Sequence, residues 1–158
     1  MTTRRQIAAE TRTYPKTVRG TAVPYGTLSA MLNDRARPYR EKIKRGALTW
    51  DDSTVLLVQH DQQGIPLARV GAGTLSFTET ADGLQFEATL PDARDDVREA
   101  LSRGDFDGSV SIGFIVDEDE YQHYEKGSIR TVTRGHLVEL SIVTRGAYAS
   151  AQIGGNDG

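Results

Sequence analysis

Residues 104–116 constrain the fold of this chain more than any other stretch, because a helix stop is followed there by strict alternation. Gly104 and Gly108 end a helical pattern, and apolar and polar residues then alternate with the period of two that a β-strand imposes. One face of this strand carries Val110, Ile112, Phe114 and Val116. The other face carries Ser109, Ser111 and Gly113. The pattern predicts a half-buried strand with serine side chains on its polar face.

Similar patterns predict strands along most of the chain and favour a β-rich fold. The expected strands are 6–13, 18–25, 39–43, 54–60, 68–80, 84–90, 121–124, 129–133 and 136–144. Residues 54–60 (TVLLVQH) are apolar on both faces and β-branched, which is typical of a buried strand. Ala81-Asp82-Gly83 supplies residues that tolerate positive φ at a hairpin turn. The acidic run 117–120 is interpreted as a strand end that turns into solvent.

One main helix is expected, over about residues 92–103. Asp92 is a suitable N-cap, and Asp95 and Asp96 lie where carboxylates favour the positive end of the helix dipole. Gly104 stops the helix. The apolar stripe of this helix comprises Val97, Ala100 and Leu101.

We interpret residues 1–153 as a single domain and residues 154–158 as a disordered C-terminal tail. A chain of 158 residues can bury roughly 70% of its unfolded surface, so a core forms without disulfides. The residues after Ala151 (QIGGNDG) contain little that can pack, and we expect them to fray.

Composition excludes several classes of function. The chain has no cysteine, which removes disulfides, thiolate metal sites and a cysteine nucleophile. A net charge of −3 at pH 7 carries no general basic signature for nucleic acid. No stretch approaches the roughly 18 consecutive apolar residues that a membrane-spanning helix needs. We therefore expect a soluble protein that is not exported and that has no nucleic-acid or membrane partner.

Three residues could together support nucleophilic catalysis. Ser111 would be the nucleophile, His60 the general base, and Glu139 the group that orients the histidine. His60 ends the buried 54–60 strand, where a rigid scaffold meets an accessible loop. Glu139 lies among apolar residues of the 136–144 strand, on a face that could converge with that of Ser111 in one sheet.

Each of the three also has an ordinary structural explanation, which pattern alone favours. Ser111 could be a small polar strand residue, His60 a hydrogen-bonded strand end, and Glu139 half of a buried ion pair. The possible ion-pair partners of Glu139 are Arg130, Arg134 and Arg145.

Other residues compete for the same roles. Ser109 shares the face of Ser111, Ser141 shares the face of Glu139, and His136 is an alternative third member. The sequence motifs of α/β-hydrolase esterases, zincins and nucleotide enzymes are absent.

Five short segments occur together in an order that one protein family shares. They are GTAVPY (20–25), EKIKRGAL (41–48), VLLVQHD (55–61), SIGF (111–114) and LVELSIV (137–143). In these segments the chain resembles the prohead maturation proteases of tailed bacteriophages, serine peptidases that are similar in fold to herpesvirus assemblins. The resemblance runs from about Gly20 to Ile153.

The resemblance implies a herpesvirus-protease-like fold, in which a single closed or partly open antiparallel β-barrel carries one main helix. It places the family's histidine on His60, its serine on Ser111, and its acid on Glu139. Assemblins use a second histidine in place of the acid, which keeps His136 open as the third member. The chain departs from the family pattern at 145–148 (RGAY), where relatives often have Pro-Ala.

The resemblance also implies a substrate and a place of action. A Ser-His-Glu serine protease would cleave the scaffolding region of the major capsid protein, or a scaffold protein, during capsid maturation. It would act inside the phage prohead in the host cytoplasm, as a homo-oligomer and without a cofactor or metal. Two alternatives remain open: a catalytically inactive β-barrel assembly or tail-tube-like structural protein, and a hydrolase of a small ester or amide.

Overall fold

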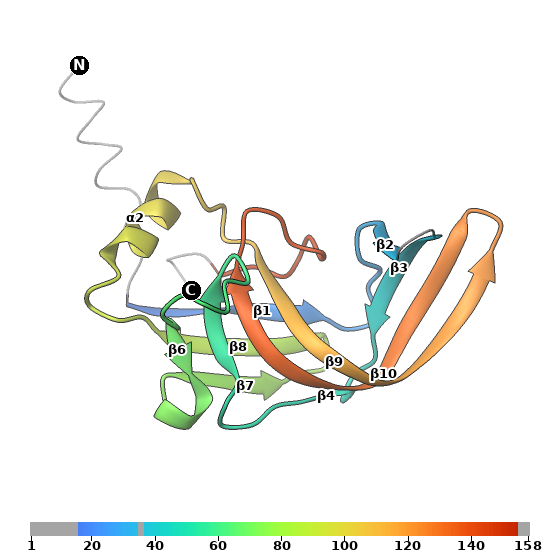
Figure 1. Ribbon diagram of the computed structural model, residues 1–158, viewed down its shortest axis with the longest axis horizontal. Coiled ribbons are helices and arrows are strands. Elements are labelled where there is room, and N and C mark those ends of the chain that lie inside the picture. Colours follow the sequence, from blue (N-terminus) through green and yellow to red (C-terminus); the bar gives the residue numbers. More distant parts are fainter. Residues whose placement is uncertain (1–15, 35–36, 155–158) are drawn as a thin grey trace, which may run out of the picture.

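The strand β10 (Gly127–Ile142) organises the fold, because both of its edges are paired (Figure 1). The computed structural model describes residues 16–34 and 37–154. One edge of β10 pairs antiparallel with β9 (Val110–Tyr124) along nearly the whole strand. The other edge pairs in succession with three shorter strands that run parallel to β10. These are β3 (Arg37–Ile43), β4 (Leu48–Thr49) and β5 (Val55–Val58).

Two short strands complete this seven-stranded sheet, and a second sheet has three strands. β2 (Leu32–Asp34) pairs with β3, and β6 (Ala68–Arg69) pairs with β5. The second sheet is antiparallel, with the order β1 (Thr17–Pro24), β8 (Gly83–Thr89), β7 (Leu75–Glu79). Figure 1 shows this sheet at one end of the molecule, whereas the tip of the β9–β10 hairpin lies with β2 and β3 at the other.

The expected β-rich fold with one main helix is confirmed, but a barrel is not seen. Among the described residues neither sheet closes on itself. The larger sheet is also not wholly antiparallel, since β10 runs parallel to β3, β4 and β5. These three consecutive strands all add to one edge of β10, so the chain does not wrap round to the outer edge of β9.

The long hairpin corrects two expectations. The segments 129–133 and 136–144 form one strand, β10, and the acidic run 117–120 lies inside β9 instead of ending it. The acidic residues stay in the ladder with β10, and two ion pairs also cross the hairpin there. Arg130 Nε lies 2.8 Å from Asp119 Oδ2, and Arg134 Nη2 lies 3.4 Å from Glu118 Oε2.

The helix α2 (Asp95–Arg103) begins later than expected. Its N-cap is Arg94, which makes no side-chain cap hydrogen bond, and Asp92 lies two residues earlier, where it forms an ion pair with Lys16. Gly104 ends the helix in the left-handed conformation, at φ 84°, as expected. The expected strand 68–80 is divided into β6, the 3-10 helix η1 (Val70–Ala72) and β7. The expected strand 6–13 lies outside the described residues.

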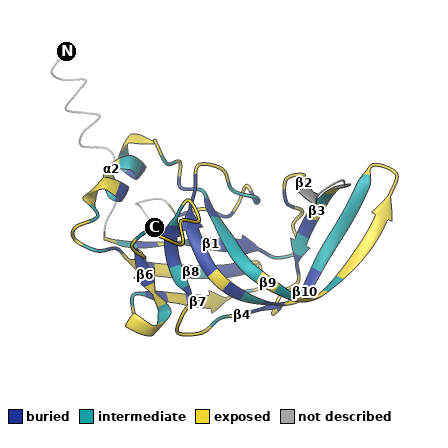
Figure 2. Cartoon of the chain, in the orientation of Figure 1, coloured by how far each residue is buried: buried dark blue, intermediate teal, exposed yellow. Residues whose placement is uncertain are grey.

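A β-bulge in β10 decides which side chains enter the core. The register between β10 and β9 shifts between Leu137 and Glu139, so one extra residue, Val138, is inserted there. Leu137, Leu140 and Ile142 are consequently all fully buried in the core. Figure 2 shows that β10 passes from intermediate burial near the hairpin tip to mostly buried toward its end. Strict alternation would place Leu137 on the face of Glu139, and the inserted Val138 puts the two side chains on opposite faces.

The end of the described chain is packed and does not fray as expected. Thr21 N donates to Gln152 O at 2.9 Å, and Ile153 N donates to Gly108 O at 2.8 Å. Gly154 N donates to Arg19 O at 2.7 Å, although the expected tail included Gly154. Backbone partners and the burial of Ile153 hold this segment, and residues 155–158 lie outside the described residues. No helix in the described part of the chain is long and apolar enough to cross a membrane.

A buried carboxylate joins β3 to the segment after β10. Glu41 is 6% exposed, and its Oε1 accepts a hydrogen bond from the Tyr148 hydroxyl at 2.9 Å. Its backbone N donates to Ser29 Oγ at 2.9 Å. Burial raises the pKa of Glu41 above the usual range, against the opposing effects of Tyr148 and of the nearby Arg130.

We predict that Glu41→Gln removes the loss of unfolding free energy that ionisation of this buried carboxyl causes as the pH rises. The pKa of Glu41 is higher in the folded chain than in the unfolded chain, so its contribution to stability falls as the pH rises through that range. Glutamine stays neutral. Urea unfolding between about pH 4 and pH 7 should show the variant gaining stability relative to the wild type as the pH rises. A constant or falling difference would contradict the prediction.

Candidate active site

His60 lies in a tight turn directly after β5, and not at the last position of the strand as expected. Gln59 and His60 have φ values of 53° and 56°, in the left-handed region. This conformation costs roughly 1–2 kcal/mol for each non-glycine residue, so other contacts must hold it. Gln59 N donates to Ile142 O at 2.9 Å, and Asp61 N donates to Val58 O at 3.0 Å.

Side-chain contacts add to these backbone bonds. Thr144 N donates to Gln59 Oε1 at 3.2 Å, and Gln59 Nε2 donates to Thr144 Oγ1 at 3.4 Å. The His60 backbone N donates to Ser141 Oγ at 3.0 Å. The end of β10 and the residues after it therefore hold the turn from one side.

The His60 ring is hydrogen-bonded to Glu139. Nδ1 of His60 contacts Oε1 of Glu139, a carboxylate that is only 3% exposed, whereas the His60 side chain is 44% exposed. A carboxylate that accepts from Nδ1–H selects the tautomer in which Nε2 is unprotonated in the neutral ring. The contact therefore leaves Nε2 as the nitrogen that can take a proton from another group.

The second oxygen of Glu139 is bound by a serine and not by an arginine. Ser141 Oγ donates to Glu139 Oε2 at 2.6 Å. Of the arginines expected as ion-pair partners, Arg130 pairs with Asp119 and Arg134 pairs with Glu118. Within residues 16–34 and 37–154, no ion pair joins Arg145 to Glu139. The Glu139 carboxylate thus binds the side chains of His60, in the turn after β5, and of Ser141, near the end of β10.

Ser111 lies on the neighbouring strand, directly opposite Ser141 in the register of β9 and β10. Directly opposed residues of antiparallel strands share a face, with Cβ atoms about 4.5–5.5 Å apart. Ser111 is half-buried. Among the described residues no hydrogen bond joins its hydroxyl to the His60 ring. The structure therefore brings His60 and Glu139 into contact and places Ser111 on the same face without a direct bond.

Gly113 makes room for the carboxylate. It lies opposite Glu139 in the register, and an ideal Cβ atom at Gly113 would lie 2.5 Å from Glu139 Oε1. Real Cβ atoms do not approach other atoms so closely, so an alanine would displace the carboxylate. The sequence motif SIGF contains this glycine, but only the structure shows that Glu139 fills the space.

The competing residues have other surroundings. Ser141 is fully buried, so its hydroxyl is closed to a substrate. Ser109 pairs with Gln152 in an isolated bridge at the start of β9. His136 binds elsewhere, since Nδ1 lies 3.0 Å from Thr49 Oγ1 and Nε2 lies 3.1 Å from Asp51 Oδ2.

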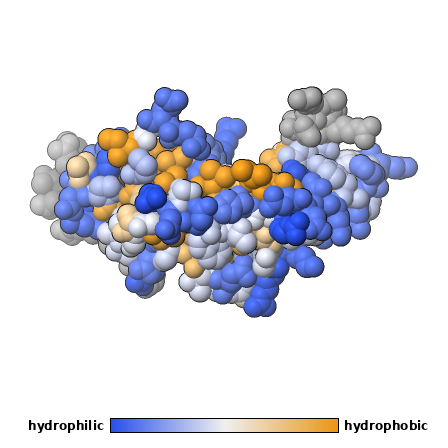
Figure 3. All heavy atoms as spheres, turned by 60° about the horizontal axis from the view of Figure 1, so that its bottom comes forward, coloured by the Kyte–Doolittle hydropathy of each residue, from blue (hydrophilic) through white to orange (hydrophobic). Residues whose placement is uncertain are grey.

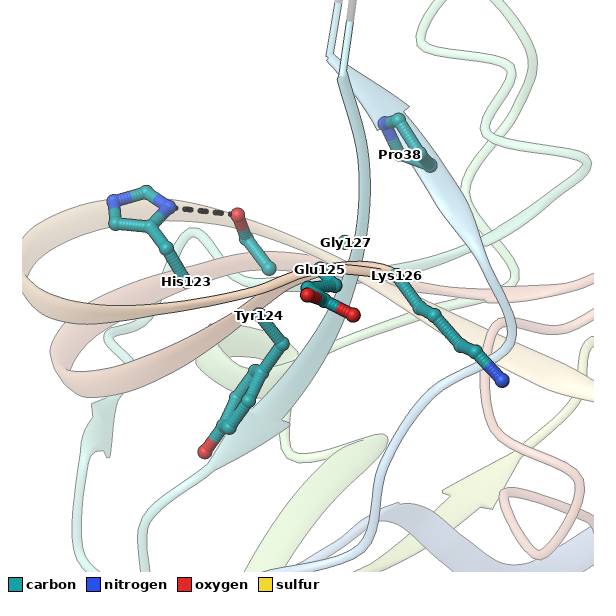
Figure 4. A pocket seen from close by; sticks show the side chains of 7 residues that line it. Pro38, His123, Tyr124, Glu125, Lys126 and Gly127 are labelled. Atoms are coloured by element: carbon teal, nitrogen blue, oxygen red, sulfur yellow. Dashed lines mark hydrogen bonds between the residues drawn. The ribbon is translucent and has the colours of Figure 1, made fainter.

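A surface pocket occurs at the far end of the β9–β10 hairpin and is separate from these residues (Figure 4). Its lining includes Pro38, His123 and Tyr124, and His123 Nδ1 lies 2.9 Å from Ser128 Oγ.

Figure 3 shows apolar side chains gathered along a band across one side of the molecule. No cluster of three metal-binding side chains occurs in the described parts of the chain.

The chain is a serine peptidase, because residues 3–156 match the model of a family of these enzymes. It belongs to the family described as Caudovirus prohead serine protease. The resemblance inferred from five short segments is thereby confirmed, and with it a protease role in bacteriophage capsid maturation. No curated protein and no solved structure matches the chain.

We predict that Gly113→Ala lowers kcat for peptide-bond cleavage by about 10- to 100-fold and leaves KM nearly unchanged. The added methyl group must push Glu139 away from His60, which removes the orientation of the ring. Steady-state kinetics with a peptide substrate provides the measurement.

Ile112→Val is the matched control, since it lies on the same strand with its side chain toward the core. Its thermal midpoint should fall by a few degrees at most while kcat stays at the wild-type level. Full activity of a folded Gly113→Ala variant would show that the position of Glu139 does not matter.

Proposed function

We propose that this protein is a serine endopeptidase that cleaves the scaffolding region of the major capsid protein, or a separate scaffold protein, during capsid maturation. The family supports the type of enzyme and its role. The observation that carries the assignment of residues is the contact of His60 with a buried Glu139, with Ser111 on the same face.

Each residue of the proposed triad has one role. The Ser111 hydroxyl attacks the carbonyl carbon of the scissile bond while His60 Nε2 takes its proton. Glu139 holds Nδ1–H and stabilises the imidazolium that forms. His60 then gives the proton to the leaving amine, and the peptide nitrogen departs. Water attacks the acyl-enzyme in the same way, His60 again taking and returning the proton, which releases the acid product and restores Ser111.

In this proposal, the hydrogen bond between Ser111 and His60 forms when the substrate binds. Catalytic hydrogen bonds are often long or poorly aligned in free enzymes and tighten when the substrate binds. His60 Nε2 is accessible for this step, because the side chain is 44% exposed and Nε2 is not the nitrogen bound to Glu139.

The setting of the reaction follows from the same proposal. The enzyme would act inside the prohead in the host cytoplasm, as a homo-oligomer, with capsid or scaffold protein as its partner. The chemistry of the triad needs no cofactor or metal. We assign the activity to one domain of residues 1–153.

We predict that co-expression with its capsid protein separates the role of Ser111 on β9 from that of Ser109 directly before it. The wild type should shorten the capsid protein, whereas Ser111→Ala should leave it at full length, as measured by intact mass. Ser109→Ala is the control, because Ser109 lies directly before β9 in an isolated bridge with Gln152, and this variant should cut like the wild type.

Two results would overturn parts of this proposal. Identical shortening by Ser111→Ala would reject Ser111 as the nucleophile. A capsid protein that stays whole with the wild type, in assembled proheads, would instead support an inactive assembly factor.

A further inference from the structure

The buried Ser141 hydroxyl contacts both His60, the candidate general base, and Glu139, the carboxylate that orients it. Ser141 Oγ accepts a hydrogen bond from the His60 backbone N at 3.0 Å and donates one to Glu139 Oε2 at 2.6 Å. The other oxygen of Glu139 contacts His60 Nδ1. The contacts therefore form a closed ring that runs from the His60 backbone through Ser141 and Glu139 to the His60 side chain.

With Glu139 as a carboxylate, the direction of each hydrogen bond in this ring follows from the groups that form it. A backbone N–H can only donate, so the Ser141 oxygen must accept from His60. The single proton of Ser141 then goes to Glu139, which uses its other oxygen for Nδ1–H. When Glu139 is ionised, the His60 backbone N–H, the Ser141 hydroxyl, the carboxylate and Nδ1 are all satisfied only if the His60 ring carries its proton on Nδ1. This is the tautomer that leaves Nε2 able to take a proton.

We propose that Ser141 is a positioning residue that holds the His60 backbone and the Glu139 carboxylate in one arrangement. This inference rests on the proposed function of His60 and Glu139. It differs from a role in the chemistry itself, since the fully buried Ser141 side chain touches no substrate.

The surroundings of Ser141 show why its two hydrogen bonds matter. His60 is held at a φ of 56°, which a histidine adopts only when its neighbours oppose the strain. Glu139 is 3% exposed, so water cannot replace a lost donor at Oε2. Without the hydroxyl, the turn loses the bond to the His60 amide and the carboxylate loses one of its two partners. Both the place and the orientation of the ring would then be less well defined.

Ser141→Ala tests the proposal through kinetics on a cleaved peptide. We expect kcat to fall about 10- to 100-fold with KM within about twofold of the wild type, because a hydrogen bond to a charged group is lost. Ser29→Ala is the matched control. Ser29 is also buried, accepts from a backbone N–H and donates to a backbone carbonyl, but has no contact with His60 or Glu139. Its kcat should equal that of the wild type.

A second readout needs no substrate. In protein with ¹⁵N-labelled histidine, the Nδ1–H proton of His60 should give a downfield NMR signal that Glu139→Gln removes. We expect Ser141→Ala to shift or broaden this signal and Ser29→Ala to leave it unchanged. A purely structural role of Ser141 would lower stability in unfolding experiments without changing the signal.

A conservative variant covers the case in which Ser141→Ala does not fold. Ser141→Cys keeps a weak donor of similar size, and kcat and the NMR signal should lie between those of alanine and serine. An unchanged signal together with an unchanged kcat in a folded Ser141 variant would overturn the proposal. If the wild type cleaves nothing, the proposed function fails, while the NMR signal still decides the role of Ser141.

Discussion

The pairing of β10 along both edges is the interaction on which the rest of the structure depends. One edge carries β9, and the other carries β3, β4 and β5 in turn. This arrangement brings Glu139 between Gly113 on one side and β5 on the other. The turn after β5 then places His60 against Glu139. A strand with one free edge could not gather residues 60, 111 and 139, which lie far apart in the sequence.

The bulge at Val138 separates the core from the candidate site within a few residues. Leu137 and Leu140 enter the core. Glu139 and Ser141, which is two residues later, belong to the opposite face. An uninterrupted strand would place Leu137 and Glu139 on one face, because side chains alternate with a period of two. One inserted residue therefore allows an apolar core and a buried carboxylate to be built from the same strand.

Strain and burial are concentrated at the same place. The left-handed turn at Gln59 and His60 and the burial of Glu139 both oppose folding, and both are offset by the same neighbours. Ser141 is the residue that contacts both. Active sites often hold such strained arrangements, because orientation of the reacting groups is needed before the substrate binds.

The sequence by itself determined the local features: the alternation of β9, the stop of α2 at Gly104, and the residue types that suit a serine peptidase. The alternation and the helix stop depend on periods and conformational preferences that a short segment carries alone, whereas the catalytic residue types were marked by the resemblance to the prohead proteases. Only the tertiary structure decided that the sheets stay open, that the acidic run continues β9, and that Ser141 joins His60 to Glu139. Strand pairing and bulges depend on contacts between distant segments, and no period within one strand reports which partner lies beside it.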